Sequence, residues 1–210
     1  MKPVPDISLA PRRTPRQARS AVTVNAIYEA TVQVLLAEGQ SRLTTTRVAE
    51  RAGVSVGTMY QYFPNKRSLL FAVLQQHLGV MAEAVEAAAQ RYDAQPIAVM
   101  ADGLVRAYVD AKTRNVEVAE ALYRIAGELD TAAMIATITK RIHKAISTLL
   151  ASASDVTFDN LREVTFTLSA TMAGACRAVF ERGATPAVVR ILRSELPVMC
   201  TAYLLVRATR

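Results

Sequence analysis

Residues 44–63 read TTTRVAERAGVSVGTMYQYF, and this stretch decides the fold of the N-terminal region. Thr44 is a suitable N-cap for a short helix over 45–52, and Ser55 for a second helix over 56–62. Between them, Gly53 allows a sharp turn because glycine adopts the left-handed backbone conformation at little cost. Two short helices joined by a turn of three to four residues predict a helix-turn-helix.

The two faces of this motif differ in chemistry. Val48, Ala49 and Ala52 form a small apolar face on the first helix, and we expect Val56 and Met59 to pack inward from the second. Leu43 and Phe63 are expected core residues at its two ends. The polar outer face of the second helix is then free to enter a major groove, with Gly57 allowing close approach to a DNA backbone. It comprises Gly57, Thr58, Tyr60, Gln61 and Tyr62.

Outside this motif, apolar residues recur at three and four positions, which predicts an all-α chain of about nine helices. The first is expected over 22–38 and ends at Gly39, and Asn65 can cap a long helix over 66–92. Further helices are expected over 96–114, 116–129, 131–151, 159–182 and 186–207.

Positive charge is concentrated in the first third of the chain. Residues 1–67 carry ten Lys or Arg and four Asp or Glu, whereas the remaining 143 residues carry 15 and 14. Such a patch is typical of a polyanion binder, although charge clustering alone fits a solubilising tail equally well. We therefore divide the chain into a flexible basic arm (1–20), a DNA-binding domain (21–81) and a C-terminal helical domain (82–210).

Composition excludes several classes of protein. Cys176 and Cys200 are too far apart for a zinc-binding spacing, and with only two histidines no metal site is expected. No uninterrupted apolar run reaches the roughly 20 residues that span a bilayer, and no secretory signal is recognisable. Hydrolase, nucleotide-binding and metalloprotease motifs are absent, so we expect a cytoplasmic non-enzyme with no cofactor and no membrane partner.

The stretch AERAGVSVGTMYQYFPNKRSLL (49–70) resembles the N-terminal domain of the TetR (tetracycline-repressor-like) transcriptional regulators, and the resemblance extends over about 21–81. It implies phosphate contacts by Thr44 or Thr45, Tyr60 and Lys66, helped by helix N-termini such as that capped by Ser55. It also implies base-edge contacts by Thr58, Gln61 and Tyr62. Arg47 replaces the acid of a capping box and places a cation where phosphate could lie.

Alternatives stay open for several of these residues. Tyr60 and Tyr62 could simply pack against the first helix, Lys66 could be a solvated helix start, and the arginines of the arm could bind DNA or be disordered. These readings differ in whether the side chain is exposed.

The C-terminal domain carries weaker signals. Small residues four apart, Ala170, Gly174 and Ala178, allow close approach of another helix. In proteins of this type, the last two helices form a four-helix dimer interface, which here would add Val189, Leu192, Leu196, Met199 and Tyr203; the alternative is a monomer core. An apolar effector pocket could be lined by Met100, Leu104, Tyr108, Tyr123 and Ile138, with His143 or Arg177 as polar anchors, although plain core packing is the simpler reading.

The leading hypothesis is a repressor that binds a palindromic double-stranded operator as a homodimer. A small, largely apolar effector would release it by changing the separation of its recognition helices. The alternatives are a DNA-binding protein without an effector and an α-helical enzyme.

Overall fold

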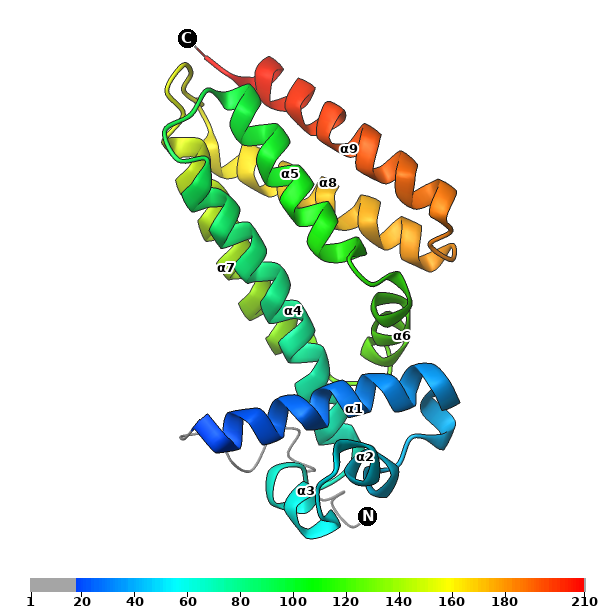
Figure 1. Cartoon of the computed structure of the whole chain (residues 1–210). Coiled ribbons are helices and arrows are strands. Elements are labelled where there is room, and N and C mark those ends of the chain that lie inside the picture. The colour runs from blue at the N-terminus through cyan, green and yellow to red at the C-terminus, as the bar shows by residue number, and fades with distance from the viewer. Residues whose placement is uncertain (1–17, 210) are drawn as a thin grey trace, which may run out of the picture. The chain divides into compact units, whose positions relative to one another are not determined.

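The computed structural model describes residues 18–209, and this part of the chain contains nine helices and no strand (Figure 1). The all-α expectation is confirmed, since the β pairing in these residues is limited to an isolated bridge between Thr157 and Thr209. The helices are α1 (Ala18–Arg42), α2 (Thr45–Ala52), α3 (Val56–Tyr62), α4 (Lys66–Arg91), α5 (Ile97–Thr113), α6 (Val116–Ala126), α7 (Ala132–Ala151), α8 (Leu161–Glu181) and α9 (Pro186–Arg207).

Capping explains where the helices begin and end. The side chains of Asn160 and Thr185 accept hydrogen bonds from backbone amides in the first turns of α8 and α9, at 3.2 and 3.4 Å. Gly39 has a φ of 77° and interrupts α1 at the residue expected to end it. A last helical turn follows this kink, so α1 extends to Arg42.

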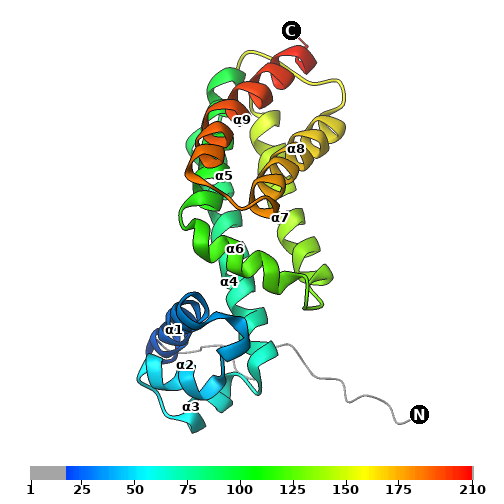
Figure 2. The same cartoon turned by 90° about the vertical axis from the view of Figure 1, so that its right-hand side faces the viewer.

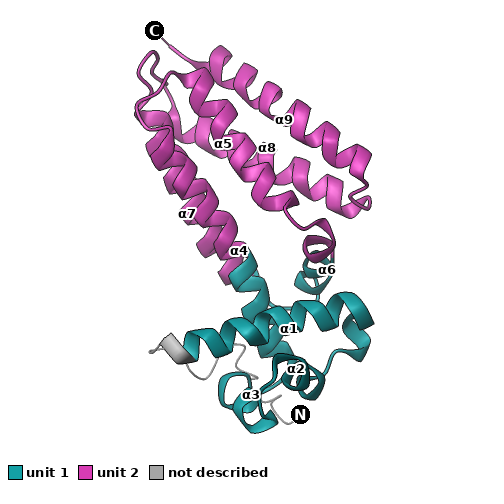
Figure 3. Ribbon diagram, in the orientation of Figure 1, with its two compact units in different colours: residues 1–77, 121–131 teal, residues 78–120, 132–210 magenta. Residues whose placement is uncertain are grey.

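Contacts divide the chain into two compact units (Figure 3). The described part of the first comprises residues 18–77 and 121–131, in which α1 packs against α2 and α2 against α3. Its core confirms the residues expected from the motif, since Leu43, Val48, Met59 and Phe63 are all buried. Val56 is 40% exposed, so the expectation that it packs inward is wrong. Its position in the first turn of α3, directly after the cap, leaves it at the surface.

The second unit comprises residues 78–120 and, in its described part, 132–209. Within it α5 packs along α9, α7 against α8, and α8 against α9 (Figure 2). Gly103 of α5 lies against the ring of Tyr92, and a Cβ at this position would overlap that ring. Both cysteines are buried, as expected of small apolar residues, and burial raises the pKa of each thiol to about 11.

The border between the units lies inside two helices. It falls after His77 in α4, near the domain limit expected after residue 81, and after Glu120 in α6. Residues 121–131 group with the first unit, which the sequence did not indicate. The expected basic arm lies outside the described residues except at its C-terminal end.

Segments 20–42 and 66–91 are long and apolar enough to cross a membrane by length and composition alone. Half of the apolar window in 66–91 is buried inside the protein, as in the core helix of a folded unit.

Candidate nucleic-acid interface

The turn between α2 and α3 has the geometry that its sequence predicts. Thr44 Oγ1 accepts a 3.3 Å hydrogen bond from the Arg47 amide, and Ser55 Oγ accepts one of 2.9 Å from the Thr58 amide. Gly53 has a φ of 68°, and its amide donates to the carbonyl of Glu50 at 3.2 Å. Both caps and the left-handed glycine are thus in place, and the helix-turn-helix prediction is confirmed.

The polar face of α3 is accessible. Gly57 and Gln61 are exposed, Tyr60 is 44% exposed, and Thr58 is half-buried. The hydroxyls of Ser55 and Thr58 lie 2.8 Å apart and share a hydrogen bond. This surface offers an amide, a phenol and hydroxyls, which are groups that can contact phosphates and base edges.

Thr45 lies behind this surface. It is 8% exposed, and its hydroxyl donates to the Tyr60 hydroxyl over 3.2 Å. The structure therefore places Thr45 where it positions Tyr60, whereas Thr44 and Tyr60 are exposed and can reach a phosphate themselves.

Two cations expected to face phosphate already have partners inside the chain. Arg47 forms an ion pair with Glu38 of α1, and the Lys66 ammonium donates to the backbone carbonyl of Gln40. Both partners flank the kink at Gly39, so the end of α1 holds the side chains in place. Sequence spacing could not show this, because the partners are 9 and 26 residues away.

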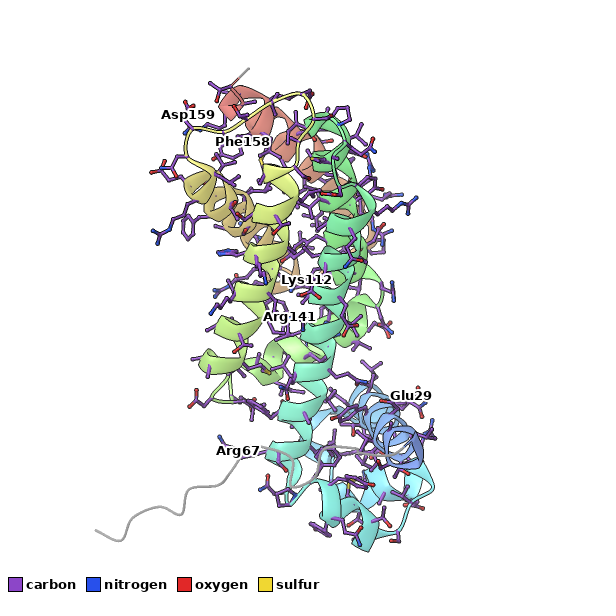
Figure 4. The ribbon with its side chains drawn as sticks, turned by 90° about the vertical axis from the view of Figure 1, so that its left-hand side faces the viewer. Glu29, Arg67, Lys112, Arg141, Phe158 and Asp159 are labelled. Atoms are coloured by element: carbon purple, nitrogen blue, oxygen red, sulfur yellow. The ribbon has the colours of Figure 1, made fainter. Side chains whose placement is uncertain are left out.

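Arg42 and Arg67 add further positive charge to the surface of this unit. Both are exposed, and neither makes an ion pair within the described part of the chain. Figure 4 labels Arg67 at the start of α4. Sequence reasoning counted these arginines only as charge, although the position of Arg67 beside Lys66 could have marked it as a candidate.

Tyr62 packs against other rings. It is half-buried, and its ring centroid lies 6.3 Å from that of Phe63, which in turn lies 5.8 Å from Tyr28. Burial raises the pKa of Tyr28, so this phenol stays neutral. Tyr62 was expected either to contact base edges or to pack inside the protein. Packing involves part of its side chain and leaves the rest accessible to DNA.

Residues expected at a dimer interface fall into two groups. Ala170, Gly174 and Ala178 lie on an exposed face of α8, and Met199 is 49% exposed on α9. Tyr203 is half-buried. By contrast, Val189, Leu192 and Leu196 are buried within this chain, so they support α9 from inside and present no surface to a second copy.

Residues expected at an effector pocket are also dispersed. Met100, Leu104 and Tyr108 are buried along one face of α5, and Ile138 is buried on α7. His143 is half-buried beside the ring of Phe166, at 6.4 Å between centroids. Tyr123 belongs to the first unit. Arg177 is exposed on α8 and pairs with Glu181 at 2.6 Å, so it does not anchor an interior pocket.

Lys112 is a buried cation that sequence reasoning missed. It is 7% exposed inside the second unit, where Figure 4 labels it, and desolvation lowers the pKa of its ammonium. Lys112 follows Met100, Leu104 and Tyr108 at intervals of four residues. Its position on this apolar face of the helix could have indicated that the lysine is buried.

Comparisons with known proteins agree with this architecture. The profile of the C-terminal domain of tetracyclin repressor-like proteins matches residues 96–204, more than half of the chain. The profile of bacterial regulatory proteins of the tetR family matches residues 27–73, which include the helix-turn-helix.

The HTH-type transcriptional repressor DrrR1 of Streptomyces coeruleorubidus is 33% identical over 113 residues, 54% of this chain and 36% of that protein. The curated relatives are each matched over 29–36% of their length.

Several solved structures share the fold. The fatty acid degradation regulator FadR from Bacillus halodurans has a TM-score of 0.67 at 16% identity, covering 90% of this chain and 97% of that one. FadR from Bacillus subtilis in complex with stearoyl-CoA has a TM-score of 0.63 at 18% identity, covering 84% and 97%. With both domain profiles matched in order along it, the chain belongs to the TetR family of bacterial regulatory proteins.

Proposed function

We propose that this protein is a transcriptional repressor that binds operator DNA as a homodimer and is released by a small-molecule effector. The observation that carries the proposal is the capped α2–turn–α3 unit, with Gly57, Tyr60 and Gln61 exposed on one face of α3. A helix presented in this way fits the major groove.

We assign the recognition of DNA bases to side chains of α3, and the contacts to phosphates mainly to residues around this helix. Gln61 can pair with adenine through two hydrogen bonds, and the methyl group of Thr58 can meet that of thymine. Tyr60, held by Thr45, and Thr44 would bind phosphates from either side of the motif. Arg42 and Arg67 would add sequence-independent attraction, which weakens as salt rises.

The exposed apolar surface of α8 and α9 supports the homodimer. It combines Ala170 and Gly174 with large apolar side chains whose exposed fractions run from 49% to 83%: Phe166, Ile191, Val198, Met199, Leu205 and Val206. Many large apolar side chains left exposed on two helices that pack against each other favour an interaction site. A two-fold symmetric dimer would also present its two α3 helices to successive turns of DNA.

An effector site is assigned to the second unit. Its buried stripe on α5 is apolar except at Lys112, which would favour an apolar ligand with an anionic end. The B. subtilis FadR complex with stearoyl-CoA, a ligand of that general chemistry, supports this assignment by analogy of fold. A ligand regulates only if it binds the DNA-bound and released states with different affinity.

Selection of binding sites from a random DNA pool at near-physiological salt tests the proposal. We expect an enriched near-palindrome, and Gln61→Ala should weaken binding to it by about tenfold, because one bidentate base contact contributes roughly 1–3 kcal/mol of discrimination.

Gln90→Ala is the matched control, since Gln90 is an exposed glutamine on α4 in the other unit and its loss should leave binding unchanged. Salt-sensitive binding with no enriched sequence would refute the operator-binding function.

A further inference from the structure

A groove of about 690 Å³ lies within the second unit, at the place where α5 ends, α6 begins and α8 turns into α9. It is separate from the buried α5 stripe to which the effector is assigned, because none of Met100, Leu104 and Tyr108 lines it. Its size lies in the range of small-molecule sites.

Three arginines and two glutamates give the groove its charge. Arg193 donates from Nε and Nη2 to Thr113 Oγ1, at 3.0 and 2.8 Å, and lies 3.7 Å from Asp110. Glu120 accepts a 2.6 Å hydrogen bond from the Ala184 amide. These two charges therefore help to build the groove.

Arg182 and Arg190 are different. Both line the groove and are exposed, and no ion pair within residues 18–209 involves either. Glu117 is the remaining acid of the lining, so the charges not used in building the groove are two cations and one anion. Guanidinium groups bind carboxylate or phosphate oxygens through paired hydrogen bonds, with higher geometric specificity than an ammonium group.

The uncharged lining comprises Thr113, Gly183, Thr185 and four apolar residues. Of these four, Val116 and Pro186 are accessible, whereas Ala184 and Val189 are buried. We propose that this groove binds a small amphiphilic oxyanion, whose carboxylate or phosphate group is held by Arg182 and Arg190 while its apolar part rests on Val116 and Pro186. The shared chemistry is an oxyanion on a small apolar body.

The groove borders α6, so a ligand bound in it would contact a helix whose second half belongs to the first unit. Val116, Glu117 and Glu120 in the first half of α6 line the groove, whereas residues 121–131 group with the unit that carries the helix-turn-helix. There Glu128 accepts a 2.6 Å hydrogen bond from Gln40, beside the kink in α1. A ligand that shifts the Glu120–Ala184 contact would act on this helix, a consequence that rests on the proposed function.

Binding is tested without DNA, so that its failure is distinct from failure of the repressor function. The full chain is titrated calorimetrically with benzoate, phenyl phosphate, inorganic phosphate and benzyl alcohol. We expect benzoate or phenyl phosphate to bind, and the comparison of the two identifies the preferred oxyanion. Benzyl alcohol lacks the charge, and inorganic phosphate lacks the apolar part. Each should therefore bind at least about tenfold more weakly.

Variants locate the site. The double variant Arg182→Gln/Arg190→Gln should lose at least about tenfold in affinity, and Glu117→Gln should gain affinity because a like charge is removed. Arg162→Gln, which changes an exposed arginine in the first turn of α8, is the control and should bind as the parent does.

Thermal unfolding of each variant checks that it is folded. Absence of binding by both organic oxyanions, equal binding of benzyl alcohol, or unchanged affinity in the folded double variant would overturn the proposal.

Discussion

The hydroxyl of Thr45 in α2 donates a hydrogen bond to the hydroxyl of Tyr60 in α3, with 3.2 Å between the oxygens. Thr45 is 8% exposed and Tyr60 is 44% exposed, so a buried group fixes the position of an accessible one. The bond crosses between the two helices of the motif. It thereby couples the packing of α2 on α3 to the position of a side chain assigned to phosphate.

Removing this bond should affect both stability and DNA binding. Tyr60→Phe deletes the acceptor and leaves the nearly buried Thr45 hydroxyl without it, which should cost about 1 kcal/mol in the free energy of unfolding. DNA affinity should fall as well, because the phenol itself is lost. Chemical denaturation and fluorescence anisotropy with labelled DNA measure the two effects. Tyr62→Phe is the control, and an equal loss of stability in that variant would argue against a specific Thr45–Tyr60 contribution.

Glu38 restrains Arg47, and its neutralisation should strengthen DNA binding. Glu38→Gln removes the ion pair and frees a cation beside the N-terminus of α2. Affinity should rise, and the slope of its logarithm against the logarithm of salt concentration should steepen by about 0.9, the value for one added phosphate contact.

Glu29→Gln separates this local effect from the change in net charge, since Glu29 is an exposed acid on the same helix (Figure 4). The same change of slope in both variants would contradict the release of Arg47.

A charge on the small-residue face of α8 should prevent dimerisation. Ala170→Glu introduces a carboxylate that would lose its hydration if a second chain packed there, and buried charges without partners are strongly unfavourable. We expect sedimentation to show a monomer that retains the helical content of the parent. Ala87→Glu places the same change on an exposed alanine of α4 and should leave the dimer intact. A dimer of unchanged stability in Ala170→Glu would exclude this face as the interface.

The ion pair between Glu86 of α4 and Arg141 of α7 should make stability depend on pH. Arg141, which is labelled in Figure 4, donates to both carboxylate oxygens of Glu86, at 2.9 and 2.7 Å, and this hydrogen bonding lowers the pKa of Glu86. A lowered pKa in the folded state means that the stabilisation is present above the usual glutamate pKa of about 4.3 and is lost as the pH falls through the lower value.

Both side chains are more than a third exposed, so Glu86→Gln should cost only about 0.5–1 kcal/mol at pH 7. Thermal unfolding at pH 7 and pH 3 measures this, and the difference between parent and variant should shrink as the pH falls. Glu83→Gln, one turn earlier on α4, should show a smaller difference at pH 7. A cost for Glu86→Gln that is as large at pH 3 as at pH 7 would show that the ion pair is not its source.

Gly103 should not tolerate a side chain. A Cβ at this position overlaps the Tyr92 ring, and such overpacking typically costs about 1–3 kcal/mol. The higher helix propensity of alanine offsets part of this cost. Gly103→Ala should therefore lower the midpoint of thermal unfolding. Gly79→Ala in α4 has no atom within 4 Å of the added Cβ and should raise it by helix propensity alone. A rise in both variants would mean that Tyr92 moves aside freely.

The sequence predicts the helix-turn-helix closely because its signals are local. Thr44, Gly53 and Ser55 act within three residues of their partners, and α2 and α3 have the expected bounds. The sequence did not predict the ion pair of Arg47 or the hydrogen bond of Lys66. Both depend on the conformation of the chain around Gly39, where their partners Glu38 and Gln40 lie.

Long-range packing likewise decides which face of a helix is buried. Helix α9 is apolar on both sides, so periodicity could not tell that Leu192 faces inward and Ile191 outward. Lys112 shows the same limit, since only the packing of its helix reveals that this lysine is buried.

The most direct test of the central claim is the dependence of binding on the spacing of operator half-sites. The selected near-palindrome is compared with versions in which five base pairs are added between the half-sites or one half-site is scrambled, and the mass of each complex is measured by sedimentation. A homodimer with paired α3 helices requires half-sites about one helical turn apart, 34–36 Å or a multiple.

The account predicts two chains per parent site and a loss of at least about tenfold in affinity for either altered site, since one half-site then lacks its base contacts. Equal affinity for the three DNAs, or one chain bound independently at each half-site, would contradict it.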